Sequence, residues 1–388
     1  MKTSHQIIFN NSNKMKTIPS ESIALMVTSP PYPMIEMWDQ MFADQNPKIG
    51  KALEKRQGTM AFELMHKVLD SVWDEVYRVL IKGGIACINI GDATRTINEN
   101  FSLYQNHTRI MGYLLTLGFN PLPAILWRKQ TNAPNKFMGS GMLPPGAYVT
   151  LEHEYILIVR KGKKREFKTS EDKEIRRESA FFWEERNVWF SDIWMDLKGA
   201  SQNLFDAKIR KRSAAFRFDV PYRLINMFSV KGDTVLDPFF GLGTTMYAAM
   251  AAGRNSMGIE LDQNFKDAIL SRMNTIVDYS NKCISARLKN HLNFVQERHK
   301  TKGGFKYLNK HYEFPVITRQ ETKLLINRLE GIKEKNNNNF QVMYSDEPQQ
   351  EFCGDGERYL STEPGISGPK KANPNKLKKQ QVQLPLLE

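Results

Sequence analysis

The sequence Thr28-Ser29-Pro30-Pro31-Tyr32 combines residue types that can act on an amine. Its two prolines fix the backbone and remove two N–H donors, which leaves exposed carbonyl oxygens as acceptors. A serine oxygen beside such a carbonyl suits an NH2 group with two hydrogens to donate. Tyr32 offers a flat face on which a base can stack. Taken alone, this stretch is better explained as an ordinary proline turn, and it becomes decisive only when paired with a second motif.

A glycine-rich turn is the second motif whose residues could bind a ligand. Asp237 ends an apolar run, Gly241 and Gly243 follow, and a helical pattern starts at once. Glycines let the backbone approach a ligand, and the N-terminus of a helix can receive polar groups. About twenty residues later, Glu260 ends another apolar run and is placed to accept both hydroxyls of a ribose, with Asp262 as a second candidate.

Rival chemistries find less support in the residues. A dinucleotide-binding oxidoreductase would require a glycine where Met246 stands, and a phosphate-binding loop would require Gly-Lys-Ser or Gly-Lys-Thr. None of the three cysteines follows a proline, which disfavours a covalent cytosine-C5 mechanism. Residues 152–154, Glu-His-Glu, are interpreted as polar residues at a strand edge and not as a metal site.

Together the two motifs resemble the amino-methylating DNA methyltransferases of the β class. Their catalytic tetrapeptide is Asp/Asn/Ser-Pro-Pro-Tyr/Phe, and their cofactor turn is Asp-Pro-Phe-x-Gly-x-Gly-Thr-Thr. The resemblance covers residues 6–275, and the catalytic motif precedes the cofactor motif as in that class. It implies S-adenosyl-L-methionine as cofactor and double-stranded DNA as substrate. It also implies a Rossmann-like seven-stranded methyltransferase sheet with circularly permuted motif order.

The resemblance also implies roles for individual residues. Residues 216–221 resemble the segment that closes over the methionine end of the cofactor. Residues 10–12 fall where members often have an acidic residue that contacts adenosine, and the sequence departs there, which puts a cofactor contact from Ser12 in doubt. The implied catalytic residues are Ser29, Pro30, Pro31 and Tyr32. The implied cofactor-binding residues are Asp237, Pro238, Phe239, Gly241, Gly243, Thr244, Glu260, Asp262 and Phe218.

The base that receives the methyl group is predicted from Ser29. Serine at this position is typical of the cytosine-N4 subgroup, whereas adenine-specific members mostly have Asp or Asn. Many adenine-specific members also read His-Pro-Thr-Gln-Lys-Pro where this chain reads Ala-Phe-Arg-Phe-Asp-Val-Pro. We therefore expect transfer to N4 of cytosine. N6 of adenine is the alternative, and a non-enzymatic DNA-binding protein is a hypothesis of a different class.

The elements that must position these motifs follow an α/β pattern. Helices are predicted at 62–80, ended by Gly83-Gly84, and at 110–117, 221–228 and 243–252. Seven strands, mostly separated by helices, predict a parallel-rich, doubly wound sheet. The strands are expected at residues 6–9, 23–27, 85–90, 122–127, 155–159, 234–237 and 257–260.

The predicted organisation has five parts around that sheet. Residues 1–160 form the catalytic half and 213–280 the cofactor-binding half of one domain. Residues 161–212, basic and rich in aromatics, form an inserted target-recognition region, helped by the loop 129–150. A helical extension follows at 281–335. A polar tail, partly disordered, follows at 336–388.

Composition fits this interpretation. The 388 residues carry a formal net charge of +13, which suits a polyanionic partner, and basic residues in 127–130 and 161–212 are expected to contact phosphates. The three well-separated cysteines and the absence of a long apolar run predict a cytoplasmic protein without a membrane segment. A cognate restriction endonuclease acting on the same site is an expected companion.

Overall fold

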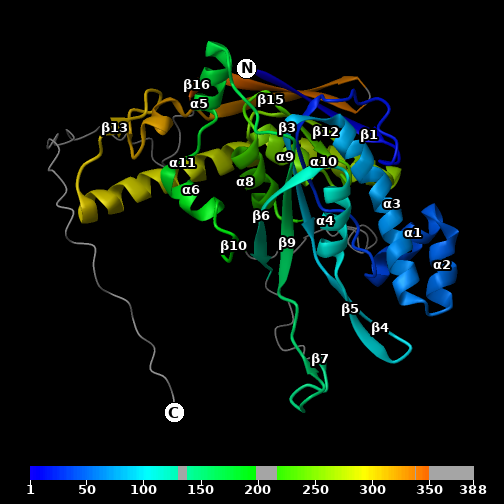
Figure 1. Cartoon of the computed structure of the whole chain (residues 1–388). Coiled ribbons are helices and arrows are strands. Elements are labelled where there is room, and N and C mark those ends of the chain that lie inside the picture. The colour runs from blue at the N-terminus through cyan, green and yellow to red at the C-terminus, as the bar shows by residue number, and fades with distance from the viewer. Residues whose placement is uncertain (130–137, 198–215, 337, 349–388) are drawn as a thin grey trace, which may run out of the picture.

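A ten-stranded mixed sheet forms the centre of the computed structural model, which describes residues 1–129, 138–197, 216–336 and 338–348 (Figure 1). The strand order is β10-β6-β9-β3-β2-β11-β12-β1-β16-β15. The strands are β1 (Lys2–Phe9), β2 (Ile23–Thr28), β3 (Leu80–Ile90), β6 (Phe119–Arg128), β9 (His153–Lys161), β10 (Ile193–Trp194), β11 (Thr234–Asp237), β12 (Asn255–Glu260), β15 (Asn327–Asn336) and β16 (Asn339–Pro348).

All seven predicted strands are present and adjacent in this sheet. Strands β3, β2, β11, β12 and β1 run parallel to one another, whereas β9 is antiparallel to both β3 and β6. The carboxyl ends of parallel strands meet at one edge of a sheet, where ligands bind in open α/β folds. The Ser-Pro-Pro-Tyr motif, Asp237 and Glu260 therefore come together at the ends of β2, β11 and β12.

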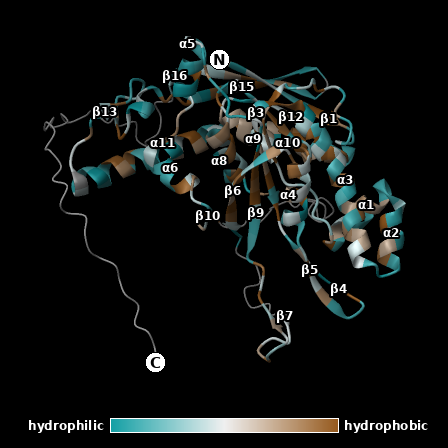
Figure 2. Ribbon diagram, viewed as in Figure 1, coloured by the Kyte–Doolittle hydropathy of each residue, from teal (hydrophilic) through white to brown (hydrophobic). Residues whose placement is uncertain are grey.

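Helices cover both faces of the sheet, as a doubly wound fold requires. Met26 of β2 packs in the core beneath α3 (Gly58–Val79) and α4 (Asn106–Thr116), whereas Leu25 and Val27 pack beneath α8 (Asp219–Phe228) and α9 (Thr244–Ala251). Burial on both faces explains why β2 is apolar from Ile23 to Val27. Figure 2 shows the same arrangement, with hydrophobic strands inside and hydrophilic colours on α5 (Ser170–Glu178).

The predicted end of the first long helix is wrong. Helix α3 ends at Val79, and Leu80 already has extended backbone angles and begins β3. The glycine pair lies inside that strand. Gly83 has a φ of +84°, and a β-carbon there would lie 2.6 Å from the backbone nitrogen of Arg165. The two glycines thus allow close approach of a neighbouring segment instead of capping a helix.

The remaining elements lie around this core. Long helix α11 (Ile276–Lys302) crosses the side of the molecule that carries α6 (Trp183–Trp189), and two hairpins extend from the sheet (Figure 1). No described helix has the length and apolar character needed to cross a bilayer. The other elements are α1 (Asp39–Gln45), α2 (Pro47–Glu54), α10 (Lys266–Met273), β4 (Ala93–Ile97), β5 (Asn100–Tyr104), β7 (Met138–Gly139), β8 (Ala147–Tyr148), β13 (Tyr307–Leu308) and β14 (Pro315–Val316).

The predicted helical extension over 281–335 is correct only as far as Lys302. Beyond it, β15 and β16 form a hairpin, and β16 pairs antiparallel with β1, so part of the predicted polar tail belongs to the sheet. Phe340, Val342 and Tyr344 alternate toward the core, which is the period of a strand. The rest of the predicted tail, residues 349–388, lies outside the described residues.

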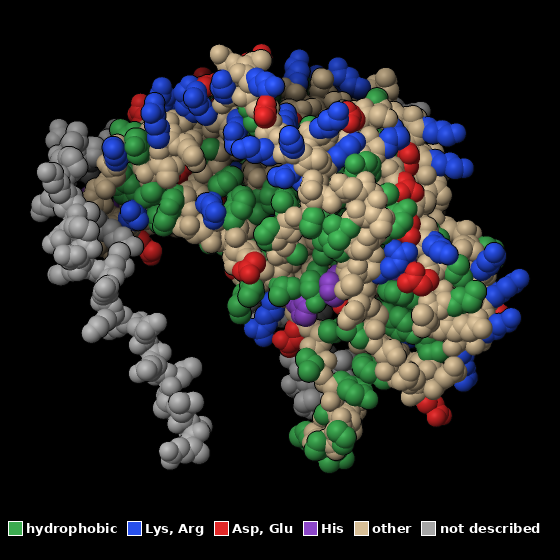
Figure 3. Space-filling view, viewed as in Figure 1, with side chains coloured by type: hydrophobic (Ala, Val, Ile, Leu, Met, Phe, Trp, Pro, Cys, Tyr) green, Lys and Arg blue, Asp and Glu red, His purple; other side chains and the backbone are tan. Residues whose placement is uncertain are grey.

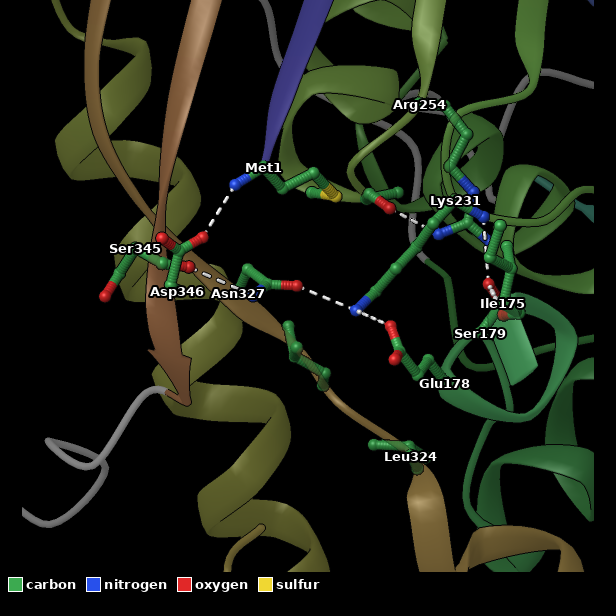
Figure 4. A network of polar contacts seen from close by, with 12 residues as sticks. Met1, Ile175, Glu178, Ser179, Lys231, Arg254, Leu324, Asn327, Ser345 and Asp346 are labelled. Atoms are coloured by element: carbon green, nitrogen blue, oxygen red, sulfur yellow. Dashed lines mark hydrogen bonds and ion pairs between the residues drawn. The ribbon is translucent and has the colours of Figure 1, made fainter. Parts of the chain in front are cut away.

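Polar contacts join this hairpin to the body of the molecule (Figure 4). The amino group of Met1 lies 2.9 Å from Asp346 Oδ1 on β16. Lys231 Nζ, before β11, lies 2.7 Å from Asn327 Oδ1 on β15 and 3.3 Å from Glu178 Oε2 on α5. Burial lowers the pKa of Lys231 to about 8. The C-terminal hairpin, α5 and the sheet are thereby linked through one buried lysine.

Candidate active site

A single hydrogen bond joins the two sequence motifs. Thr28, the residue before Ser29, is fully buried and donates through Oγ1 to Asp237 Oδ1 at 2.6 Å. The same carboxyl oxygen accepts from the backbone N–H of Phe239 at 3.1 Å. Burial raises the pKa of Asp237 to about 6. Asp237 thus holds the start of the glycine turn against the end of β2, across more than 200 residues of sequence.

The glycine turn has the backbone geometry that the sequence predicts. Gly241 and Gly243 have φ values of +53° and +80°, which favour glycine, and α9 begins directly after them at Thr244. The N–H of Phe240 donates to the carbonyl of Ile259 at 3.0 Å, which fixes the turn against β12. Space remains beside Gly241, because a β-carbon there would meet no atom within 4 Å.

Glu260 lies directly beside this turn. Its Oε2 accepts from the N–H of Gly241 at 2.7 Å, and its Oε1 accepts from the N–H of Asp262 at 2.8 Å. Burial raises its pKa to about 7. Each oxygen has a further lone pair, so the carboxylate can accept two more hydrogen bonds. Asp262 instead caps the short helix η2 (Gln263–Phe265) through the N–H of Asn264 at 3.0 Å.

A cavity of about 360 Å³ opens next to the end of β12. Its volume falls in the range of small-molecule sites. The N–H of Asn10 donates to the carbonyl of Glu260 at 2.9 Å, which places the cavity beside that residue. Ser12 donates to the carbonyl of Pro238, so it holds the start of the glycine turn. The lining residues are Ile8, Asn10, Asn11, Asn13, Lys14, Met15, Lys16, Thr17 and Ile259.

Side chains from two further strands surround the Ser-Pro-Pro-Tyr motif. Tyr32 Oη lies 3.3 Å from Ser29 Oγ and 3.0 Å from Glu154 Oε2. Asn89 Nδ2 lies 3.0 Å from Tyr32 Oη and 2.6 Å from Glu154 Oε2, and Lys129 Nζ lies 2.8 Å from Glu154 Oε1. Burial, and then the negative charge of Glu154, raises the pKa of Tyr32 well above its ordinary value.

Sequence reasoning missed three members of this network. Asn89 is not among the predicted site residues, Lys129 is predicted only as a phosphate contact, and Glu154 is predicted only as a polar residue at a strand edge. Strand β9 pairs between β3 and β6, which brings all three residues beside Tyr32. Only Asn89 leaves a signal in the sequence, because it interrupts the apolar run of β3 near its end, and in the structure it is 2% exposed.

The predicted methionine-end residue Phe218 has a packing role in the structure. It precedes α8, and its ring stacks on Tyr222 with centroids 5.3 Å apart and meets the edge of Tyr279 at 5.0 Å. These two ring contacts are with α8 and α11, and neither involves the glycine turn. The assignment of Phe218 to the cofactor therefore stays a prediction.

Three of the described aromatics in the predicted recognition insert are core residues. Phe182, Trp189 and Trp194 are 0%, 7% and 0% exposed. Helix α6 is attached to α11 by Glu185, which lies 2.5 Å from Arg287 Nε. Residues 198–212 of the insert lie outside the described residues. The described part is thus anchored in the body, and these three aromatics serve packing.

An arm between β6 and β9 carries the most exposed large apolar side chains of the described residues. Lys129 and Glu152 stand at its base, joined by a backbone hydrogen bond of 2.8 Å, and β7 and β8 pair within it. Met142, Leu143 and Val149 are 84%, 71% and 86% exposed. Residues 130–137 lie outside the described residues. The arm therefore extends an apolar surface directly from the Tyr32 network.

Comparisons with known proteins agree with this geometry. The DNA methylase family of N6 and N4 enzymes matches residues 23–271. Type II methyltransferase M.MthZI of Methanothermobacter thermautotrophicus is 53% identical over 347 residues, covering 89% of this chain and 96% of that protein. Type II methyltransferase M.MjaI of Methanocaldococcus jannaschii is 52% identical over 278 residues, covering 69% and 90%.

A solved structure supports the same assignment. TTHA0409 of Thermus thermophilus, a candidate DNA modification methylase solved with S-adenosyl-L-methionine, is 30% identical with a TM-score of 0.54. The similarity covers 69% of this chain and 92% of that one. The family match and the close relatives establish the same conclusion as the paired motifs at the sheet edge: the chain belongs to the N6/N4 DNA methylase family.

Proposed function

We propose that the protein transfers a methyl group from S-adenosyl-L-methionine to N4 of cytosine at a specific site in double-stranded DNA. The observation that carries the proposal is the Thr28–Asp237 hydrogen bond of 2.6 Å, because it joins the amine-binding motif to the glycine turn. Methyl transfer requires the donor and the accepting amine to meet at one place. Ser29 is the residue that favours cytosine over adenine.

The cofactor site fits the residues that surround it. Glu260 would accept the two ribose hydroxyls, the cavity beside it would hold the adenine, and Gly241 and Gly243 would admit the amino-acid end past the N-terminus of α9. When bound, S-adenosyl-L-methionine supplies a methyl group already activated on a sulfonium. The protein therefore has to bind, orient and stabilise charge, without forming a covalent bond to the base.

The Ser-Pro-Pro-Tyr motif would bind and orient the base and stabilise the charge that develops on it. An aromatic amine is a poor nucleophile, because its lone pair is delocalised into the ring. Hydrogen bonds from the amine to Ser29 Oγ and to the carbonyl of Pro30 favour the pyramidal form and stabilise the positive charge that develops. A base paired within a duplex is out of reach, so it is flipped out and stacked on Tyr32.

Target recognition is proposed for residues 161–212 together with the arm at 138–150. Lys and Arg side chains spread over the part of the surface that carries α5 and β15, while the arm that carries β7 ends in hydrophobic side chains (Figure 3). Basic residues suit phosphates, and exposed apolar side chains suit contact with bases that have been unstacked. Arg128 pairs with Glu152 at 3.2 Å, and Lys129 pairs with Glu154. A phosphate bound there would take the place of these carboxylates as the partner of each basic side chain.

The type II methyltransferases among its relatives favour a place in a restriction-modification system. In that setting the product would protect host DNA from an endonuclease that cuts the same sequence. A chimera that exchanges residues 161–212 and 138–150 for those of a relative should protect a different set of sites. An active chimera with unchanged sites would move recognition elsewhere.

Mass spectrometry of digested DNA tests the proposed product. Unmethylated DNA incubated with enzyme and cofactor should yield N4-methylcytosine. N6-methyladenine would overturn the choice of base and leave the methyltransferase assignment intact. No methylated base, together with no cofactor binding by calorimetry, would favour a non-enzymatic DNA-binding protein instead.

A further inference from the structure

The phenol of Tyr32 is the centre of a network that extends beyond the Ser-Pro-Pro-Tyr motif. Its Oη has three polar side-chain neighbours, Glu154 Oε2 at 3.0 Å, Asn89 Nδ2 at 3.0 Å and Ser29 Oγ at 3.3 Å, and it also accepts from the backbone of Gly91. Glu154 and Asn89 are almost fully buried, so bulk water competes little for these bonds. The network joins β2, β3 and β9 at the point where the target amine would bind.

The hydrogens in this network can be assigned from what each group can donate. A carboxylate only accepts, so Tyr32 donates its single hydrogen to Glu154. The amide of Asn89 turns its nitrogen toward Glu154, because its oxygen would otherwise meet a carboxylate oxygen at 2.6 Å. The phenol oxygen can then only accept from its other neighbours. In the 3.3 Å contact between the two hydroxyls, Ser29 Oγ is therefore the donor and Tyr32 Oη the acceptor.

We propose that Glu154 is a positioning residue that acts through the Tyr32 hydroxyl to fix Ser29 as a hydrogen-bond acceptor toward the target amine. The inference rests on the proposed function for the identity of that amine. A free serine hydroxyl could rotate its hydrogen toward the amine lone pair and oppose the reaction. With that hydrogen committed to Tyr32, Ser29 Oγ presents only lone pairs, and the acceptor is organised before the base arrives.

Two neighbours hold the network in place. Lys129 Nζ binds the second oxygen of Glu154 at 2.8 Å, which fixes the plane of the carboxylate. Gly91 leaves room for the tyrosine ring, because a β-carbon at residue 91 would lie 2.9 Å from Tyr32 Cε2. The high pKa of Tyr32 keeps its proton available for donation to Glu154.

Replacing Glu154 with glutamine tests the direction of these bonds. Lys129 opposes the new amide nitrogen at one end of the side chain, and Asn89 opposes it at the other. The carboxylate that accepted the Tyr32 hydrogen is gone, so the hydrogen of Ser29 is no longer committed to Tyr32. We expect Glu154→Gln to lower the single-turnover methyl-transfer rate about tenfold or more, with cofactor affinity unchanged. Glu54→Gln is the matched control, because Glu54 is exposed on α2 and outside the network.

A double-mutant cycle separates this role from a merely structural one. Tyr32→Phe keeps the ring and removes the hydroxyl, so Glu154→Gln should cost nothing further in that background. Independent, multiplying losses would overturn the proposal, as would a Glu154→Gln rate equal to that of the wild type. A wild type that methylates no DNA would instead overturn the proposed function.

A second cycle keeps the proposal testable if Glu154→Gln fails to fold. In a Ser29→Ala background, Tyr32 has no serine to orient, so Tyr32→Phe should leave the rate unchanged. The same loss from Tyr32→Phe in both backgrounds would overturn the proposal. Calorimetry with S-adenosyl-L-methionine on every variant confirms that the cofactor site is intact.

Discussion

The ring of Phe240 lies so close to the backbone of Gly258 that a β-carbon on residue 258 would fall 1.9 Å from Phe240 Cδ2. Gly258 is in the middle of β12, and Phe240 belongs to the glycine turn after β11. The backbone of Phe240 also bonds to Ile259 at 3.0 Å. The position of the turn therefore depends on the absence of a side chain one strand away.

Replacing Gly258 with alanine should displace the turn and weaken cofactor binding. Phe240 is 3% exposed and has little room to move, so the added methyl must shift the backbone around Gly241 and Gly243. We expect S-adenosyl-L-methionine affinity to fall at least about tenfold, measured by calorimetry, since overpacking costs on the order of 1–3 kcal/mol.

Gly112→Ala is the matched control for this substitution. Gly112 lies in α4, and a β-carbon there meets no atom within 4 Å. The variant should bind the cofactor normally and gain about 0.5–1 kcal/mol of stability, because alanine favours a helix. Equal affinities for the two variants would show that the turn tolerates a side chain at residue 258.

Cofactor binding should strengthen as the pH rises through about 7. Burial raises the pKa of Glu260 to about 7, and the ionised carboxylate is the form that accepts two ribose hydroxyls. Below that pH, binding must first remove a proton, so the affinity should fall as the solution becomes more acidic. Above it, the contribution of Glu260 should level off.

Calorimetry with wild type and Glu260→Gln between about pH 6 and 8 checks this pH dependence. The amino group of the cofactor also titrates near this range, at about 7.7–8.0, but it does so in both proteins. Only the wild type should show the additional loss of affinity on the acidic side. Parallel pH profiles for the two proteins would exclude Glu260 as the titrating acceptor.

Replacing Ser29 with alanine should lower turnover far more than cofactor binding. The proposed hydrogen bond strengthens as positive charge develops on the amine, so its loss is felt in the transition state. We expect kcat to fall about 10- to 100-fold, the equivalent of one bond to a charged group. Ser22→Ala, whose Oγ bonds to the carbonyl of Pro19 before β2, is the control. Equal losses of turnover and cofactor affinity would indicate a structural serine.

The seven central strands and the position of both motifs were predictable from sequence. Strands buried on both faces are apolar, so residues 23–27 are recognisable as a strand followed by Thr28, and Val235 and Leu236 as a strand that ends at Asp237. The parallel arrangement then brings Ser29 and Asp237 to the same edge. Local pattern and sheet geometry are sufficient for that part of the site.

The Tyr32 network was not predictable in the same way. Glu154 reaches Tyr32 because β9 runs antiparallel between β3 and β6, and a pairing over such a sequence distance leaves no local pattern. The C-terminal hairpin was not predicted from the sequence for another reason. Residues 333–336 of β15 are exposed and polar, and only alternate residues of β16 are buried. Neither strand therefore forms the continuous apolar run by which the central strands are recognised.

The buried Lys231 should make the protein more stable in alkaline solution. Its folded-state pKa is lowered to about 8, whereas an unfolded lysine has a value of 10.5. Between these two values the unfolded chain binds more protons than the folded chain, so the free energy of unfolding rises with pH across that window. Below about pH 8 both states are protonated, and the burial penalty is fully present.

Urea unfolding of wild type and Lys231→Met at several pH values between 8 and 10.5 isolates this contribution. Methionine has no titrating group, so the stability of the wild type relative to the variant should increase with pH by on the order of 2 kcal/mol. Lys51→Met, at an exposed position on α2, removes the same charge and should follow the wild type. If the difference between wild type and Lys231→Met stayed constant, the contacts to Asn327 and Glu178 would have to compensate fully for the burial of the ammonium group. A difference that shrank with rising pH would mean that the network stabilises the charged lysine, and that Lys231 joins β15 and α5 as an ion pair throughout this range.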